Sequence, residues 1–288
     1  MQSKRKTILT ILLFCFVIAC FAIASLPYLR KSDPPAADGR LELRFLDVGQ
    51  GDSTLVVCDG HAMLIDGGPA KSSDRIYATL KQLQIEHLDY IVATHPHNDH
   101  VGGLSGALNY ASVGTALSPV PEADGRAFQS FLKYLRQQDV EITVPSPGDT
   151  FSLGSASFTV LAPLDMVSEM NSNSIVLRLT YGGFHALFTG DAESDEEQSI
   201  LQSGCDLQSD VLKVGHHGGS DACGEDWLRK VSPKVSVISS GAGNEYGHPS
   251  EQTIRRLESS GSEVLRTDQL GDILIIVSPD GTISRPEG

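Results

Sequence analysis

The chain has 288 residues, and its 40% hydrophobic content is enough for one large core or two modest ones. Its net charge is −14, with acidic residues spread along the whole length, so composition provides no basic footprint for tight, nonspecific binding of a polyanion. The five cysteines include no C-x-x-C pair, which argues against a cysteine-based zinc knuckle. A polyanionic substrate stays compatible with this charge, because a bound divalent metal would reverse the local field.

Residues 1–30 are predicted to form a membrane or signal segment. A basic cluster at residues 4–6 precedes an uncharged run over residues 7–29, which is long enough to cross a bilayer as a helix. Positive charge at this end favours a cytoplasmic N-terminus and export of the remaining chain. Three outcomes stay open: a secretory cleavage site at residues 22–24, a lipoprotein box ending at Cys20, and an uncleaved anchor. All three export the rest of the chain, to the extracellular side of the cell membrane or as a secreted protein.

A short linker and one globular domain are expected to follow. Residues 31–40 include two adjacent prolines and a glycine and have little to bury. The domain should span residues 41–288. It begins with alternating apolar and polar residues over 41–48, which predict a strand.

Strands and helices alternate along this domain. Apolar residues at helical spacing predict helices at 73–84, 103–110, 125–138 and 250–257. Alternating or continuous apolar runs predict strands at 41–48, 53–58, 62–65, 90–93, 113–117, 140–144, 151–161 (two short strands), 175–179, 186–189, 211–214, 235–239, 272–277 and 282–285. Several of these strands end in polar residues, which predicts a two-sheet core flanked by helices, with a site along one edge.

The hexapeptide H-P-H-N-D-H at residues 95–100 supplies four potential metal ligands within six residues. It follows the apolar run 90–93 and precedes two glycines, so a buried strand would hold these side chains on a rigid edge. Neutral imidazoles with a carboxylate suit zinc, manganese or iron(II). A loop that is rich in histidine by chance would need three of only nine histidines to fall here. The pattern therefore indicates a metal site.

Four further side chains, Asp66, Asp191, His216 and His248, follow predicted strands. Each is a weak signal by itself, since an aspartate before glycines often forms a turn and a histidine after a strand is often only hydrogen-bonded. Together with the hexapeptide they would supply the bridging carboxylate and the additional imidazole of a two-metal site. The ions of such sites lie about 3.5–4 Å apart, where they activate water and stabilise a leaving oxygen.

Six motifs occur in an order that resembles a known superfamily. They are F-L-D-V-G-Q-G-D-S at 45–53, I-D-G-G at 65–68, T-H-P-H-N-D-H-V-G-G at 94–103, T-G-D at 189–191, G-H-H-G at 215–218 and Y-G-H-P at 246–249. The H-x-H-x-D-H pattern resembles the signature of the metallo-β-lactamase superfamily. The full set resembles the C-terminal hydrolase domain of ComEC-type competence proteins and its stand-alone relatives, over nearly the whole predicted domain.

This resemblance implies an α/β fold, the αββα sandwich, with a dinuclear site between its two sheets. Two divalent ions, zinc or manganese, would be bound by His95, His97, Asp99, His100, Asp191 and His216. By the same resemblance Asp191 would bridge the ions and Asp66 would orient the site. Asp99 would also position the attacking water or accept its proton, and His248 would approach the substrate or leaving group.

Three features depart from the family pattern. Many superfamily hydrolases have a histidine shortly before the T-G-D strand, but this chain has N-S-N-S at 171–174, so Asn173 would assist a weakly held ion. The relatives usually have His-His-Gly-Ser, whereas here a second glycine follows Gly218. His217 in this loop is the alternative ligand to His216. One apolar segment stands in place of a multi-span channel, so we expect the chain not to be the DNA transporter itself.

These features predict an exported metal-dependent phosphodiesterase that uses a metal-bound hydroxide. The resemblance makes DNA the first expected substrate, and small phosphoesters such as phosphocholine esters are the nearest alternative. A non-catalytic metal-binding module of the cell envelope is the alternative from another class, which loss of metal ligands would indicate. The sequence implies membrane association through the N-terminal segment and identifies no protein partner.

Overall fold

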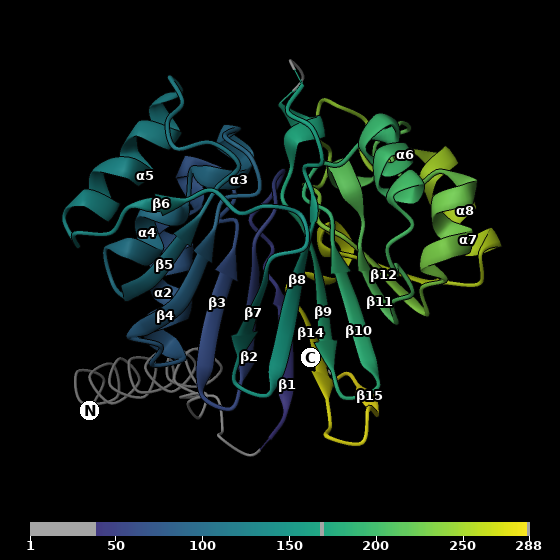
Figure 1. Cartoon of the computed structure of the whole chain (residues 1–288), viewed down its shortest axis with the longest axis horizontal. Helices are drawn as coiled ribbons and strands as arrows, with labels where there is room; N and C mark the ends of the chain where they lie inside the picture. Colours follow the sequence, from purple (N-terminus) through teal and green to yellow (C-terminus); the bar gives the residue numbers. More distant parts are fainter. Residues whose placement is uncertain (1–38, 168–169, 287–288) are drawn as a thin grey trace, which may run out of the picture. The chain divides into compact units, whose positions relative to one another are not determined.

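Two β-sheets lie face to face in the part of the chain that the computed structural model describes, residues 39–286 without residues 168 and 169 (Figure 1). The predicted membrane or signal segment, residues 1–30, lies outside the described residues. Among the residues that are described, no helix is long and apolar enough to span a membrane.

The first sheet has eight strands. Their order is β15 (Ile283–Ser284), β14 (Ile273–Val277), β1 (Leu41–Phe45), β2 (Thr54–Cys58), β3 (His61–Ile65), β4 (His87–Val92), β5 (Ser112–Leu117) and β6 (Ile142–Thr143). The strands from β15 to β3 pair antiparallel, and those from β3 to β6 pair in parallel. Leu41, Leu43 and Phe45 alternate along β1 and are buried between the sheets, while Glu42 and Arg44 between them form an ion pair of 2.7 Å.

The second sheet has seven strands. Their order is β13 (Glu263–Arg266), β12 (Val235–Ile238), β11 (Val211–Lys213), β10 (Phe184–Phe188), β9 (Val176–Tyr181), β8 (Ala156–Ala162) and β7 (Thr150–Leu153). The strands from β10 to β13 pair in parallel and the others antiparallel. Phe188 stacks on Phe45 of the first sheet with ring centroids 6.4 Å apart, so the inner faces share one apolar core.

Helices cover the outer face of each sheet (Figure 1). The first sheet is covered by α2 (Ser73–Gln82), α3 (Asn98–Val101), α4 (Leu104–Leu108) and α5 (Arg126–Arg136). The second is covered by α6 (Ser194–Ser203), α7 (Glu225–Val231) and α8 (Glu251–Ser259), and the short helices are η2 (Ala70–Ser72), η3 (Asn171–Asn173), η4 (Gly215–Gly218) and α9 (Thr267–Leu270). The predicted αββα sandwich is confirmed.

Among the elements that lie where the sequence analysis predicted none are α6, α7 and β13. The first turn of α6 carries Asp195, Glu196 and Glu197, which complement the helix dipole but leave little apolar periodicity. The other two elements have seven and four residues, which is too short for a clear period. Core packing stabilises α7, and pairing with β12 stabilises β13, whereas the residues of these elements show no strong preference for helix or strand.

The parallel strands end in register, and this places their following loops side by side. Ile65 at the end of β3 pairs with Val92 at the end of β4. In the second sheet Phe188 pairs with Lys213, which in turn pairs with Val237. The carboxyl ends of parallel strands are a common place for a site, because the loops there leave a rigid edge.

Candidate metal centre

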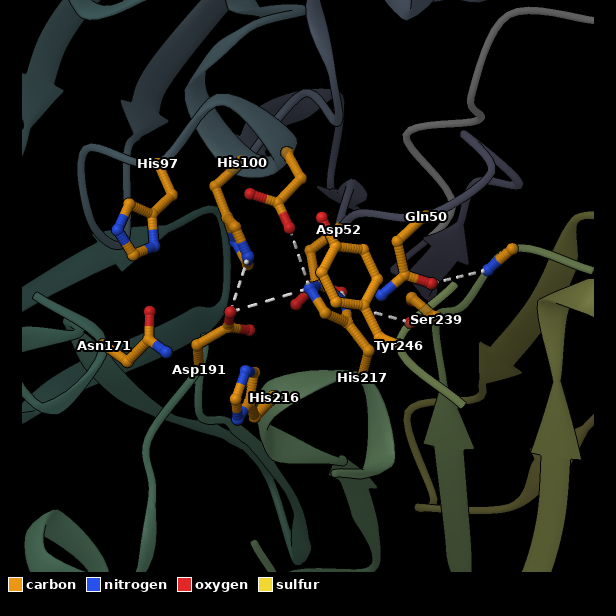
Figure 2. A network of polar contacts seen from close by, with 12 residues as sticks. Gln50, Asp52, His97, His100, Asn171, Asp191, His216, His217, Ser239 and Tyr246 are labelled. Atoms are coloured by element: carbon orange, nitrogen blue, oxygen red, sulfur yellow. Dashed lines mark hydrogen bonds and ion pairs between the residues drawn. The ribbon is translucent and has the colours of Figure 1, made fainter. Parts of the chain in front are cut away.

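Loops from both sheets converge on one group of imidazole and carboxylate side chains (Figure 2). Asp52, His100, Asp191 and His217 each offer a ligand atom, these atoms all lie within 4.8 Å of one another, and all four residues are buried. Asp52 precedes β2, and His100 lies on α3, whereas Asp191 follows β10 and His217 lies on η4. The group is therefore built from the edges of both sheets.

The hexapeptide after β4 turns directly into α3, so its histidines point to the same side. Nε2 of His95 lies 3.0 Å from Nδ1 of His97 and 3.8 Å from Oδ2 of Asp191. His95 is completely buried, whereas His97 lines an open cavity. These two rings form one side of the group.

Asp66 and Asp191 lie on opposite sides of the His100 ring. Nδ1 of His100 lies 2.8 Å from Oδ2 of Asp66, and Nε2 lies 3.1 Å from Oδ2 of Asp191. Asp66 is itself fixed, because its carboxylate accepts hydrogen bonds from the backbone N–H and the hydroxyl of Thr94, at 2.9 and 2.7 Å. A carboxylate that holds one ring nitrogen sets the orientation of the other nitrogen toward a metal.

The two adjacent histidines of η4 have different partners. Nε2 of His217 lies 3.2 Å from Oδ2 of Asp99 and 3.5 Å from Oδ2 of Asp191. His216 instead places Nδ1 3.1 Å from Asp221 and 3.4 Å from Glu193. The structure therefore brings His217 into the buried group and leaves His216, the predicted ligand, beside it.

Asp52 and Lys213 form a buried pair behind His217 to which the sequence analysis assigned no role. Nζ of Lys213 lies 2.5 Å from Oδ2 of Asp52, and the other oxygen of Asp52 lies 3.1 Å from Nδ1 of His217. Nδ1 of His217 is also 3.1 Å from the carbonyl oxygen of Ser239. The sequence did contain a signal for this pair: Lys213 belongs to the otherwise apolar strand β11, and a buried lysine needs a carboxylate partner.

Asn173 does not reach the group. Its side chain is 5% exposed, accepts a hydrogen bond from the backbone N–H of Val167 at 2.7 Å and donates one to the carbonyl of Val167 at 2.8 Å. The nearby Asn171 lines the cavity instead and donates to Glu193 at 2.7 Å. Of these two asparagines, Asn171 and not Asn173 therefore faces the cavity.

A cavity of about 330 Å³ opens over the group. It is lined by Gln50, His97, Asn98, Asp99, Asn171, Asp191, His216, His217, Tyr246 and His248. The ring of His248 lies 5.1 Å from that of His216, centroid to centroid, and 6.4 Å from that of His217. His248 therefore forms part of the cavity wall.

Burial and neighbouring charges shift the pKa values of the group in opposite directions. Desolvation lowers the pKa of His95 well below its usual value, aided by the charge of His100. Burial also opposes the charged form of His217, but Asp191 and Asp52 outweigh it and raise the pKa of His217 to about 10. The pKa of Asp191 stays well below its ordinary value despite burial, because His100 and His217 face it. The carboxylates are thus ionised and balanced by protons that a divalent cation would displace.

The residues present fit a divalent metal. Oδ1 of Asp191 is buried without a hydrogen-bond partner, and a buried polar atom of this kind calls for a ligand. Imidazole nitrogens and carboxylate oxygens are suitable donors for zinc, manganese and iron. The described residues contain one other such group, Glu193, His216 and Asp221, which is partly exposed.

Comparison with known proteins assigns the chain to a family. The sequence model of the family described as the metallo-beta-lactamase superfamily matches residues 46–242, which include all the side chains of the buried group. The chain belongs to the metallo-β-lactamase superfamily. Hydrolysis is the usual chemistry of this superfamily, and the buried group is a possible metal site.

Curated relatives of this superfamily member are competence proteins of the ComEC type. ComE operon protein 3 of Bacillus subtilis is 30% identical over 259 residues, which cover 83% of this chain and 33% of that protein. Competence protein ComA of Neisseria gonorrhoeae is 32% identical over 228 residues, which cover 78% and 30%. The predicted resemblance is confirmed, and the chain spans about a third of the length of these relatives.

Solved structures with this superfamily fold are more distant in sequence. CmlA, a diiron β-hydroxylase of Streptomyces venezuelae, has a TM-score of 0.53 at 16% identity and covers 78% of this chain and 52% of that one. A diphosphatase of the PhnP family has a TM-score of 0.50 at 18% identity and covers 77% and 94%. At these identities the likeness shows the fold alone.

Proposed function

We propose that this chain is an exported metal-dependent phosphodiesterase that acts on nucleic acid. The observation that carries the proposal is the buried group of His100, Asp191 and His217, which opens into a cavity lined by further imidazole and amide side chains. The ComEC-type relatives support a nucleic-acid substrate, and the superfamily supports hydrolysis. Export rests on the predicted segment at residues 1–30.

The ligands of two ions, zinc or manganese, would come from six side chains. They are His95, His97, Asp99, His100, Asp191 as the bridge, and His217, with His216 as its alternative. When bound, the ions would supply an activated water and positive charge opposite the substrate phosphate. Asp66 and Asp52 would hold the rings of His100 and His217 so that each presents Nε2.

Asp99 would position the attacking water. Its carboxylate lies at the cavity, and Oδ2 lies 3.2 Å from Nε2 of His217. Burial raises the pKa of Asp99, but the hydrogen bond to His217 and the charge of His100 outweigh it and bring the pKa below its usual range. A carboxylate with so low a pKa is a weak base, so orientation of water suits it better than storage of a proton. His248 on the cavity wall would contact the leaving group.

The test is hydrolysis of bis(p-nitrophenyl) phosphate and of linear DNA by the purified full chain, first stripped of metal and then supplied with zinc or manganese. We expect metal-dependent turnover that Asp99→Ala abolishes. The control is Asp74→Ala on the exposed face of α2, which should retain activity. Bound metal without turnover of either substrate would overturn the proposal and favour a non-catalytic module, whereas turnover of the small ester alone would favour a small phosphoester substrate.

A further inference from the structure

Tyr246 is an exposed aromatic side chain beside the candidate metal centre. It is 64% exposed and lines the same cavity as Asp191 and His217. Among the large hydrophobic side chains that are exposed in the described part of the chain, it is the one aromatic ring. An aromatic ring that is not packed into the core leaves a large apolar surface to water, which a planar ligand would cover.

The loop around Tyr246 is held in place by one amide side chain. Oδ1 of Asn244 accepts hydrogen bonds from the backbone N–H groups of Tyr246 and His248, both at 3.1 Å. Nδ2 of Asn244 donates to the carbonyl oxygens of Gly241 at 2.9 Å and His248 at 2.5 Å. Because the backbone on both sides of Tyr246 is fixed, the ring is presented without a large ordering cost on binding.

Gln50 braces the same loop from the first sheet. Its Oε1 accepts a hydrogen bond from the backbone N–H of Gly241 at 3.1 Å. A Cβ atom at position 241 would lie 2.6 Å from the backbone nitrogen of Gln50, so glycine is needed for this close approach. Gln50 and Tyr246 both line the cavity, and in Figure 2 the amide nitrogen of Gln50 points away from the hydrogen bond that its Oε1 accepts. A flat ring face and a hydrogen-bond donor therefore belong to the lining of one cavity.

The charges around the cavity differ between its two sides. On one side His216 contacts the carboxylates of Asp221 and Glu193. On the other side Gln50 and Tyr246 carry no charge, and the residues that line the cavity include no lysine or arginine. Ion pairs with lysine or arginine are therefore not available to a phosphodiester in this cavity, and the neutral part of the substrate should lie on the uncharged side.

We propose that Tyr246 stacks on an unpaired nucleobase next to the scissile phosphate and that Gln50 donates to the edge of that base. The proposal rests on the phosphodiesterase function and names its substrate class, single-stranded nucleic acid. An unpaired base exposes a face for stacking, whereas the faces of bases in a duplex are covered by their neighbours. The cavity of about 330 Å³ is also at the lower end of small-molecule sites, which suits one nucleotide.

The first experiment compares two substrates with the same leaving group, thymidine 5′-(p-nitrophenyl) phosphate and methyl p-nitrophenyl phosphate. Tyr246→Ala should raise KM for the thymidine ester by about tenfold and lower kcat/KM for the methyl ester much less, while Tyr246→Trp should retain the preference. Tyr134→Ala, on α5 and outside the cavity, is the matched control. Equal loss on both esters would overturn the subsite and indicate a structural role, as would no loss on the thymidine ester.

A second measurement does not depend on turnover, so failure of the subsite and failure of the phosphodiesterase proposal can be distinguished. The emission of the exposed tryptophan in Tyr246→Trp should be quenched by oligothymidylate, whereas inorganic phosphate should leave it unchanged. The native Trp227 is buried and supplies a constant background. Absence of quenching, or equal quenching by phosphate, would overturn the subsite whether or not the chain hydrolyses either ester.

Discussion

Nε2 of His217 lies 3.2 Å from Oδ2 of Asp99, although 118 residues separate them in the sequence. The contact joins η4, which follows β11 in the second sheet, to α3 at the edge of the first. It closes the buried group, because Asp191 lies 3.5 Å from the same ring nitrogen. Metal binding should therefore depend on both sheets and on the position of η4.

The two histidines of η4 offer a direct comparison. His217→Ala should lower metal affinity by about 100-fold or more, because it removes a donor atom from the buried group. His216→Ala should have a much smaller effect, since its ring contacts Asp221 rather than Asp191. Isothermal titration with Mn²⁺ or Zn²⁺ into the stripped protein measures both. A larger loss for His216→Ala would restore the assignment made from the family pattern.

The choice between these histidines illustrates what a sequence can and cannot predict. The hexapeptide at 95–100 could be recognised because its ligands are close in sequence, and strands such as β1 could be predicted because their apolar residues alternate. The αββα sandwich followed from the family resemblance. Which of the two rings faces the buried group depends on backbone angles. His216 and His217 both have positive φ, 45° and 52°, in a turn that no local sequence pattern predicts.

Contacts between segments that are far apart in the sequence were the second feature that the sequence could not predict. Asp52 and Lys213 are paired only after both sheets have formed, so neither carries a local signal stronger than an isolated polar residue. Asn173 looked suitable because of its place before the T-G-D strand, yet its side chain is satisfied by Val167 within its own loop. Long-range pairing and loop closure thus determine which of these residues belong to the site, and the spacing of residues in the sequence does not.

The Asp52–Lys213 pair should be important for stability. Lys213→Met would leave the buried carboxylate of Asp52 without its closest positive partner, and removing one member of a buried pair costs about 3–5 kcal/mol. Adding Asp52→Asn should recover part of this loss, because the uncompensated charge is then removed. Urea unfolding of the metal-free protein measures the free energy of unfolding for each variant.

A surface pair provides the control for that experiment. Lys234 lies 2.8 Å from Asp210, but its side chain is mostly exposed, so Lys234→Met should cost at most about 1 kcal/mol. If Lys213→Met were no more destabilising than Lys234→Met, the buried pair would not be a structural requirement.

Gly103 allows two loops of the site to touch. A Cβ atom there would lie 2.0 Å from the carbonyl oxygen of Gly67, and the backbone N–H of Gly67 donates to the carbonyl of His100 at 2.7 Å. Gly103→Ala should therefore push the loop of Asp66 away from His100, with a loss of several kcal/mol in unfolding free energy and weaker metal binding. Gly125→Ala is the control, since nothing lies within 4 Å of its Cβ position. Equal thermal unfolding of the two variants would refute the steric argument.

Glu196 on α6 should make the protein less stable as pH rises. Burial raises the pKa of Glu196 to about 10 from an ordinary value of 4.5. Between these two values the folded protein keeps a proton that the unfolded chain releases, so stability falls with pH. One such group contributes a slope of about 1.4 kcal/mol per pH unit. The contribution of Glu196 to stability is complete below its pKa in the unfolded chain and is lost as pH rises through its pKa in the folded protein.

Glu196→Gln removes this titration, so the unfolding free energy of the variant should depend less steeply on pH between about pH 7.5 and 9.5. The pKa of Glu197 is raised only to about 7, so it contributes little in this window. His217, whose pKa is raised to about 10, adds the same slope to the parent and the variant and cancels in their difference. Glu258→Gln at an exposed position of α8 should leave the slope unchanged. Parallel curves for the parent and Glu196→Gln would mean that Glu196 titrates near its ordinary pKa.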